Sequence, residues 1–166
     1  MKKFLPFIIS ILIGPYCCAQ DFAVLDAITL ESQEDYQKAE ETVLDCTTYL
    51  LSTPLQKKNV NRQSATRFVA LWMTGTPDYS FAIDATSMEI AGKNELLLGV
   101  YMAAMARFVL TNKEYAEDDD EIKLQTVLRT LEYCSEPKNK VKQHKKLKEI
   151  IAIERSGDLE TYLNIF

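Results

Sequence analysis

Residues 95–110 read ELLLGVYMAAMARFVL, and this stretch decides the fold. Apolar side chains fill one helical face and cover much of the opposite face. They are Leu97, Val100, Tyr101, Ala104, Met105 and Phe108 on the first face, with Leu96, Leu98, Met102 and Val109 on the second. A helix that is apolar nearly all round needs other elements packed around it. The run is too short for a membrane span and contains Arg107, so we predict a central helix that begins after a cap at Asn94.

Amphipathic helices are predicted on both sides of this central helix. Apolar residues recur there at steps of three and four, with charged residues between them. The predicted ranges are 33–51, 61–75, 118–135, 139–154 and 158–166. The second of these starts from a cap at Asn61 and ends on Gly75 as a left-handed C-cap. Residues 79–91 are expected to be irregular with one short helix.

These elements define the expected fold class. Six or so helices joined by short turns, with strand content near zero, are typical of an all-α bundle of the irregular or orthogonal kind. Residues 20–166 are about the usual length of one domain and long enough to bury a core. The sequence therefore predicts a single α-helical domain over 20–166.

The N-terminal segment has the three parts of a secretory signal peptide. Lys2 and Lys3 precede an apolar run over 4–13, and small residues stand before a cut after Ala19. We predict that residues 1–19 are removed and that the protein is exported to the periplasm or the cell exterior. Two alternatives stay open. An uncleaved anchor would need roughly 20 apolar residues, and a lipid-modified cysteine would need better-fitting residues before Cys17 or Cys18.

The charge balance argues against nucleic acid as a partner. The formal net charge is −5, and it moves to −7 when Lys2 and Lys3 are lost with the signal peptide. Six lysines fall within 138–148, on a predicted helix that also carries His144 and Glu149. We interpret these lysines as a solvated helix face. The mature chain is expected to lack a membrane span.

The mature chain keeps two cysteines, Cys46 and Cys134, each on the apolar face of a predicted helix. An oxidising compartment would allow a disulfide between them. The alternative is two separate buried thiols that act as small apolar residues. The sequence leaves both readings open, because it does not show whether the two Cα atoms approach one another.

No cofactor, metal or catalytic residue is predicted. His144 is the only histidine, so the common zinc sites are excluded, and no nucleophile or carboxylate is placed beside it as a general base would require. The acidic run 117–121 lacks the spacing and glycine of a calcium loop. We interpret that run as the acidic first turn of a helix.

Four residues are candidates for ligand binding. Asp78 and Tyr79 lie in a compact polar turn that follows Gly75, and Trp72 lies one helical turn before it. Arg107 is a guanidinium on an apolar helix, and it either reaches solvent at the last turn or meets an acid such as Asp84.

Two classes of function fit these features. The first is a non-catalytic exported domain that binds a protein, a peptide or an envelope component through a helical surface. The second is a hydrolase of the cell envelope that uses carboxylates alone, with Asp78, Asp84, Glu89 and Glu95 as candidates. The first class is preferred, because acids are abundant in this chain and their proximity in sequence is unremarkable.

Overall fold

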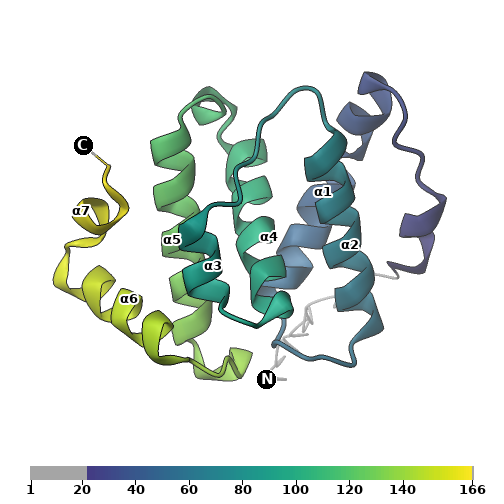
Figure 1. Ribbon diagram of the computed structural model, residues 1–166. Helices are drawn as coiled ribbons and strands as arrows, with labels where there is room; N and C mark the ends of the chain where they lie inside the picture. Colours follow the sequence, from purple (N-terminus) through teal and green to yellow (C-terminus); the bar gives the residue numbers. More distant parts are fainter. Residues whose placement is uncertain (1–21, 166) are drawn as a thin grey trace, which may run out of the picture.

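A computed structural model describes residues 22–165, and all of its regular elements are helical (Figure 1). The predicted all-α bundle is therefore confirmed for this part of the chain. In chain order the elements are η1 (Phe22–Ala27), α1 (Gln33–Ser52), α2 (Val60–Gly75), α3 (Ala85–Ala91), α4 (Glu95–Thr111), η2 (Lys113–Tyr115), α5 (Asp119–Ser135), η3 (Pro137–Asn139), α6 (Lys145–Ser156) and α7 (Leu159–Leu163). The predicted signal peptide over 1–19 lies outside the described residues.

Helix α4 is the centre of the bundle, as predicted. Helices α1, α2, α3 and α5 all pack against it, and Figure 1 shows it between α5 on one side and α1 and α2 on the other. A Cβ atom added at Gly99 would lie 2.7 Å from Thr66 Cγ2 of α2, so glycine is needed where these two helices approach. The apolar run therefore buries its residues against four neighbours.

The outer elements complete the molecule at its two edges. Helix α6 packs on α3, α5 and α7, and η1 packs on α2 (Figure 1). None of the described helices has the length and hydropathy of a membrane span.

Two predicted details at the ends of α2 are wrong. The N-cap is Asn59, whose side chain accepts from the Arg62 amide at 2.9 Å, rather than Asn61. Gly75 is the last helical residue and does not have a positive φ. Glycine is needed at position 75 because there is no space for a side chain. A Cβ atom there would lie 1.9 Å from the Tyr36 hydroxyl oxygen.

The lysine-rich helix begins later than predicted, at Lys145 instead of Asn139. Asn139 is buried and its Nδ2 donates to the Tyr133 carbonyl at 2.9 Å, and Lys140 has a left-handed φ of 55°. These two residues turn the chain away from a helical path. His144 is then the N-cap of α6, and its Nδ1 accepts from the Leu147 amide at 3.4 Å.

Cys46 and Cys134 are buried free thiols in the structure, which is the second of the two readings left open by the sequence. Cys46 lies on α1 and Cys134 on α5, and α4 packs against both of these helices. Burial raises the pKa of each thiol to about 12.

Candidate functional site

Trp72 lies in the hydrophobic core and presents no surface to a ligand. Its side chain is 0% exposed, and its Nε1 donates to the Tyr36 carbonyl at 3.0 Å. The rings of Tyr79 and Phe81 each lie 5.8 Å from the Trp72 ring, centroid to centroid. Trp72 therefore holds the loop after α2 against the bundle from inside.

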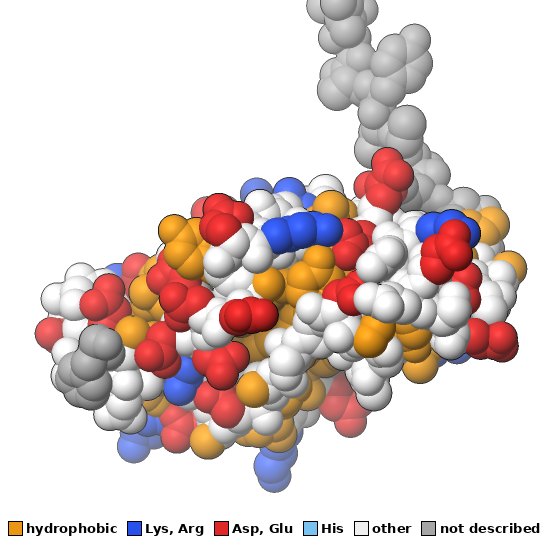
Figure 2. Space-filling view, turned by 90° about the horizontal axis from the view of Figure 1, so that it is seen from above, with side chains coloured by type: hydrophobic (Ala, Val, Ile, Leu, Met, Phe, Trp, Pro, Cys, Tyr) orange, Lys and Arg blue, Asp and Glu red, His pale blue; other side chains and the backbone are white. Residues whose placement is uncertain are grey.

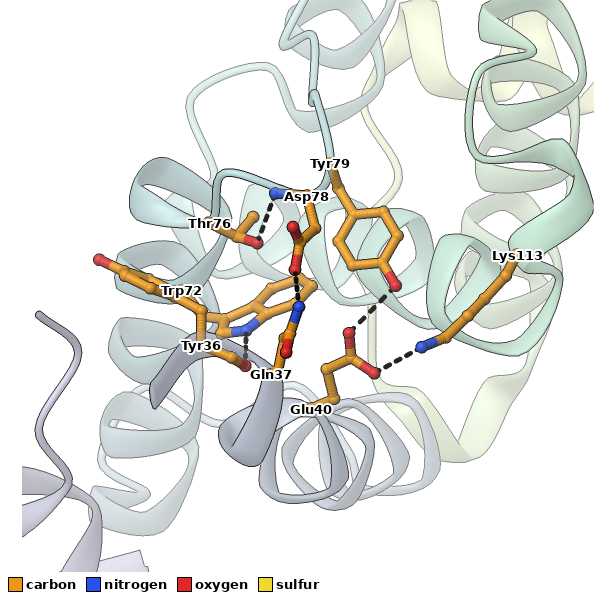
Figure 3. Close-up of polar contacts among 8 residues, drawn as sticks. All are labelled: Tyr36, Gln37, Glu40, Trp72, Thr76, Asp78, Tyr79 and Lys113. Atoms are coloured by element: carbon orange, nitrogen blue, oxygen red, sulfur yellow. Dashed lines mark hydrogen bonds and ion pairs between the residues drawn. The ribbon is translucent and has the colours of Figure 1, made fainter. Parts of the chain in front are cut away.

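The predicted turn at Asp78 is fastened to α1 by two glutamines, of which Figure 3 draws Gln37. The Asp78 carboxylate accepts hydrogen bonds from Gln33 Nε2 and, at 2.9 Å, from Gln37 Nε2. Its own backbone amide donates to Thr76 Oγ1 at 3.4 Å. Both carboxylate oxygens of Asp78 thus have partners within the chain.

Tyr79 belongs to a second set of contacts on α1 (Figure 3). Its hydroxyl donates to Glu40 Oε1 at 3.0 Å, and Lys113 Nζ pairs with Glu40 Oε2 at 2.7 Å. Lys113 Nζ also lies 5.9 Å from the Tyr79 ring centroid. Burial raises the pKa of Tyr79, and the hydrogen bond to Glu40 raises that of Lys113. The structure thus brings Trp72, Asp78 and Tyr79 together, as a fastening between the 76–81 loop and α1.

Arg107 lies apart from this cluster and does not meet Asp84. Its Nη1 donates to Thr48 Oγ1 on α1 at 2.7 Å, and the side chain is half-buried. Asp84 instead pairs with Lys123 at 3.2 Å and accepts from the Ser87 amide as the N-cap of α3. Arg107 therefore joins α4 to α1 and does not form the pair with Asp84 that the sequence left open.

The four carboxylates considered for hydrolysis are dispersed. Asp78 is bonded to glutamines and Asp84 to Lys123, whereas Glu89 accepts from the Tyr162 hydroxyl and pairs with Lys146 at 3.8 Å. Glu95 lies in a different hollow, described next. Within residues 22–165 no group of three or more histidine, cysteine or acidic side chains is arranged to hold a metal ion.

The largest hollow among those described is lined by lysines and has a volume of about 1020 Å³. We call it the lysine groove. Three segments far apart in the sequence form it: 55–63 around the start of α2, 93–96 at the start of α4, and 140–142 before α6. The lining residues are Leu55, Lys57, Lys58, Gln63, Lys93, Asn94, Glu95, Leu96, Lys140 and Lys142.

Within the part of the chain that the structure describes, no ion pair neutralises the lysines of the groove. All five lysines are exposed, and none of them forms an ion pair with a described acidic residue. Glu95 is the single acid in the lining. Asn94 stands at the N-cap of α4 but its side chain makes no capping hydrogen bond, contrary to our prediction. The partial positive charge of that helix end therefore adds to the field of the lysines.

A buried arginine lies under the same part of the molecule. Arg62 is 1% exposed, and its Nη1 donates to the Thr53 carbonyl at 3.2 Å and to Thr53 Oγ1 at 3.0 Å. Its Nε and Nη2 have no hydrogen-bond partner, and it forms no ion pair with a described acid. Burial lowers the pKa of Arg62, but an arginine stays protonated in proteins. Its guanidinium carbon lies 5.8 Å from the Tyr133 ring centroid, and Arg62 is not among the residues that line the groove.

Sequence reasoning missed the lysine groove. It placed all six lysines of 138–148 on one helix, whereas Lys140 and Lys142 precede α6 and meet lysines from two other loops. One signal was available, because Lys57, Lys58 and Lys93 also stand just before predicted helix starts. Loops that precede helix starts gather at one end of a bundle when those helices run in the same direction.

No protein-family model, curated protein or solved structure matches this chain.

Proposed function

We propose that this protein is an exported, non-catalytic helical domain that binds an anionic ligand in the lysine groove. The ligand classes are an acidic peptide or protein segment and an anionic component of the cell envelope. The observation that carries the proposal is a hollow of about 1020 Å³ with five unpaired lysines in a chain whose net charge is −5. Concentrated like charge of this kind destabilises a folded protein, so five lysines around one hollow favour a binding role over a structural one.

Magnitudes favour a ligand that carries several negative charges. One exposed ion pair contributes about 0.2 to 1 kcal/mol. Five such pairs supply about 1 to 5 kcal/mol, which corresponds to dissociation constants no tighter than roughly 0.2 mM. A single small anion would bind more weakly still. No aromatic side chain lines the groove on which a base could stack, so nucleic acid stays the less suitable polyanion.

The carboxylate hydrolase ranks second. Asp78 and Asp84 are each held by partners within the chain, and Glu89 and Glu95 lie with other sets of residues. An acid–base pair needs two carboxyl groups on opposite sides of one bond, roughly 5 to 10 Å apart. No observation in the described residues favours such a pair.

The test is a titration of the protein with a hexaglutamate peptide and with vesicles that contain anionic phospholipid, followed by calorimetry. We expect binding that weakens as salt rises. The groove variant carries Lys57→Gln, Lys93→Gln and Lys142→Gln, and we expect it to lose most of the affinity.

A matched variant controls for net charge. It carries Lys38→Gln, Lys148→Gln and Arg155→Gln, which remove the same charge from positions outside the groove lining. We expect this control to bind nearly as well as the original protein. Equal losses in the two variants, or no binding of either anionic probe by the original protein, would overturn the proposal.

A further inference from the structure

The end of the molecule opposite the lysine groove carries unpaired acids. We define the acidic end as Glu114, Glu117, Asp118, Asp119 and Asp120, which lie in and after η2 and at the start of α5. All five are exposed, and none forms an ion pair with a described basic residue. Figure 2 shows acidic side chains gathered on the face seen from above, where this end of the bundle lies.

Helix α4 separates the two charged regions. Lys93 and Asn94 of the groove stand immediately before it, and Glu114 follows it within a few residues. A helix of 17 residues is about 25 Å long at 1.5 Å per residue. The Debye length at physiological salt is about 8 Å, so the two regions scarcely attract each other within one molecule. Each is left to pair with charges outside its own chain.

We propose that the acidic end of a second copy of this chain occupies the lysine groove. The inference rests on the proposed function, because it names a partner for that same site. Among the described residues, five acids without an ion pair match five lysines without an ion pair, and all ten side chains are exposed. Acidic and basic surfaces of this kind steer association and set its orientation.

The geometry also specifies the form of the assembly. The two surfaces differ, so the contact is head-to-tail, and the bound pair still offers one free groove and one free acidic end. Because these surfaces lie at opposite ends of α4, repetition of the contact gives an open chain of molecules instead of a closed dimer. Charge pairing alone makes the contact weak, in the class of small transient interfaces.

The experiment measures the mass of the purified protein by sedimentation velocity as salt is varied. We expect association that grows with protein concentration at about 20 mM salt and is lost at about 500 mM, where the Debye length is only about 4 Å. The groove variant (Lys57→Gln, Lys93→Gln, Lys142→Gln) and an acidic-end variant (Glu114→Gln, Glu117→Gln, Asp120→Asn) should each be monomeric alone.

Mixing these two variants gives the decisive result. The intact acidic end of the first fits the intact groove of the second, and every other pair of surfaces has lost most of the charge on at least one side, so the mixture should form one-to-one dimers that grow no further. The control variant with Lys38→Gln, Lys148→Gln and Arg155→Gln should associate like the original protein.

Two failures can be told apart. If the original protein stays monomeric at low salt but still binds hexaglutamate, the second copy is not the partner and the anion-binding groove stands. If it neither associates nor binds hexaglutamate, both proposals fall. Association that survives in the groove variant would also overturn this inference.

Discussion

At the scale of single residues, burial decides what the two cysteines can do. Cys46 is 0% exposed and Cys134 is 3% exposed, and burial raises the pKa of both thiols to about 12. The thiolate is the reactive form of cysteine. Both side chains therefore stay protonated and unreactive in the folded protein at physiological pH, which fits a packing role.

The raised pKa values predict how stability depends on pH. In the unfolded chain a thiol ionises near pH 8.5 to 9, whereas in the fold it keeps its proton until about pH 12. The contribution of each thiol to the free energy of unfolding is therefore fully present below about pH 8.5 and is lost as pH rises toward 12. The loss is up to about 1.4 kcal/mol per pH unit for each thiol.

The measurement is urea unfolding at pH 8, 9 and 10, for the original protein and for the variant with Cys46→Ala and Cys134→Ala. The variant should be less stable at pH 8, since it loses buried sulfur atoms, but its stability should fall less steeply with pH. Parallel slopes would show that neither thiol is protected from ionisation. A thiol reagent should label the original protein only after unfolding.

Single positions also show where sequence reasoning stops. The apolar period predicted that Trp72 lies on a buried face, and it is fully buried, yet the same residue was named as a ligand contact. Gly75 was interpreted from its place at a helix end as a left-handed C-cap. The structure gives a different reason for glycine there, because the Tyr36 hydroxyl of another helix leaves no room for a side chain. A contact between distant segments of the chain leaves no mark in the local sequence.

At the scale of elements, α6 depends on a cap that reaches a second helix. His144 Nδ1 accepts from the Leu147 amide at 3.4 Å, while Nε2 lies 3.1 Å from the Ile90 carbonyl on α3. Because a carbonyl oxygen can only accept, this pair of bonds places the proton on Nε2. The ring thus caps the start of α6 and fixes the position of this helix against α3.

Substitutions at His144 should separate these two roles. Alanine removes both bonds and should cost about 1 to 3 kcal/mol of unfolding free energy. Asparagine is a good N-cap that cannot span to Ile90 in the same way, so its cost should be smaller than that of alanine. Lys145→Ala is the control, because Lys145 is exposed and its loss should fall within about 0.5 kcal/mol. Equal unfolding free energies for His144→Ala and Lys145→Ala would contradict this account.

Helix periods were read correctly from the sequence, but some helix starts were not. Residues 33–51 and 95–110 match α1 and α4 closely, because their apolar period is uninterrupted. The start of α6 was placed six residues early. Its true position depends on the buried side chain of Asn139, which bonds to Tyr133, and on the amide of Leu55, which donates to the Asn139 carbonyl at 2.9 Å. These are tertiary contacts, and helix propensity alone does not report them.

At the scale of the whole molecule, the central helix was predictable and the lysine groove was not. An all-round apolar run has only one stable place in an all-α domain, and α4 occupies it. The groove instead combines three segments whose mutual approach is decided by packing. The groove is positively charged, whereas the chain as a whole has a net charge of −5. The net charge therefore did not predict a site for anions.

The concentration of charge at the two ends predicts an unusual response to salt. Like charges repel within the groove and within the acidic end, whereas the exposed ion pairs, such as Lys38 with Glu34, contribute little. Screening of the repulsion should therefore outweigh screening of the pairs. At a protein concentration low enough to keep the chain monomeric, we expect the thermal midpoint, measured by circular dichroism, to rise between about 20 mM and about 500 mM sodium chloride.

The groove variant with Lys57→Gln, Lys93→Gln and Lys142→Gln links this response to function. Relief of repulsion should raise its thermal midpoint by about 1 to 3 °C at low salt, and the gain should shrink at high salt. The control variant with Lys38→Gln, Lys148→Gln and Arg155→Gln should show no such gain, because Lys38→Gln removes the ion pair with Glu34. A higher thermal midpoint together with weaker ligand binding in this variant would show that the three lysines serve binding and not stability. A lower midpoint in the groove variant would instead assign the lysines to folding and remove the main support for the binding proposal.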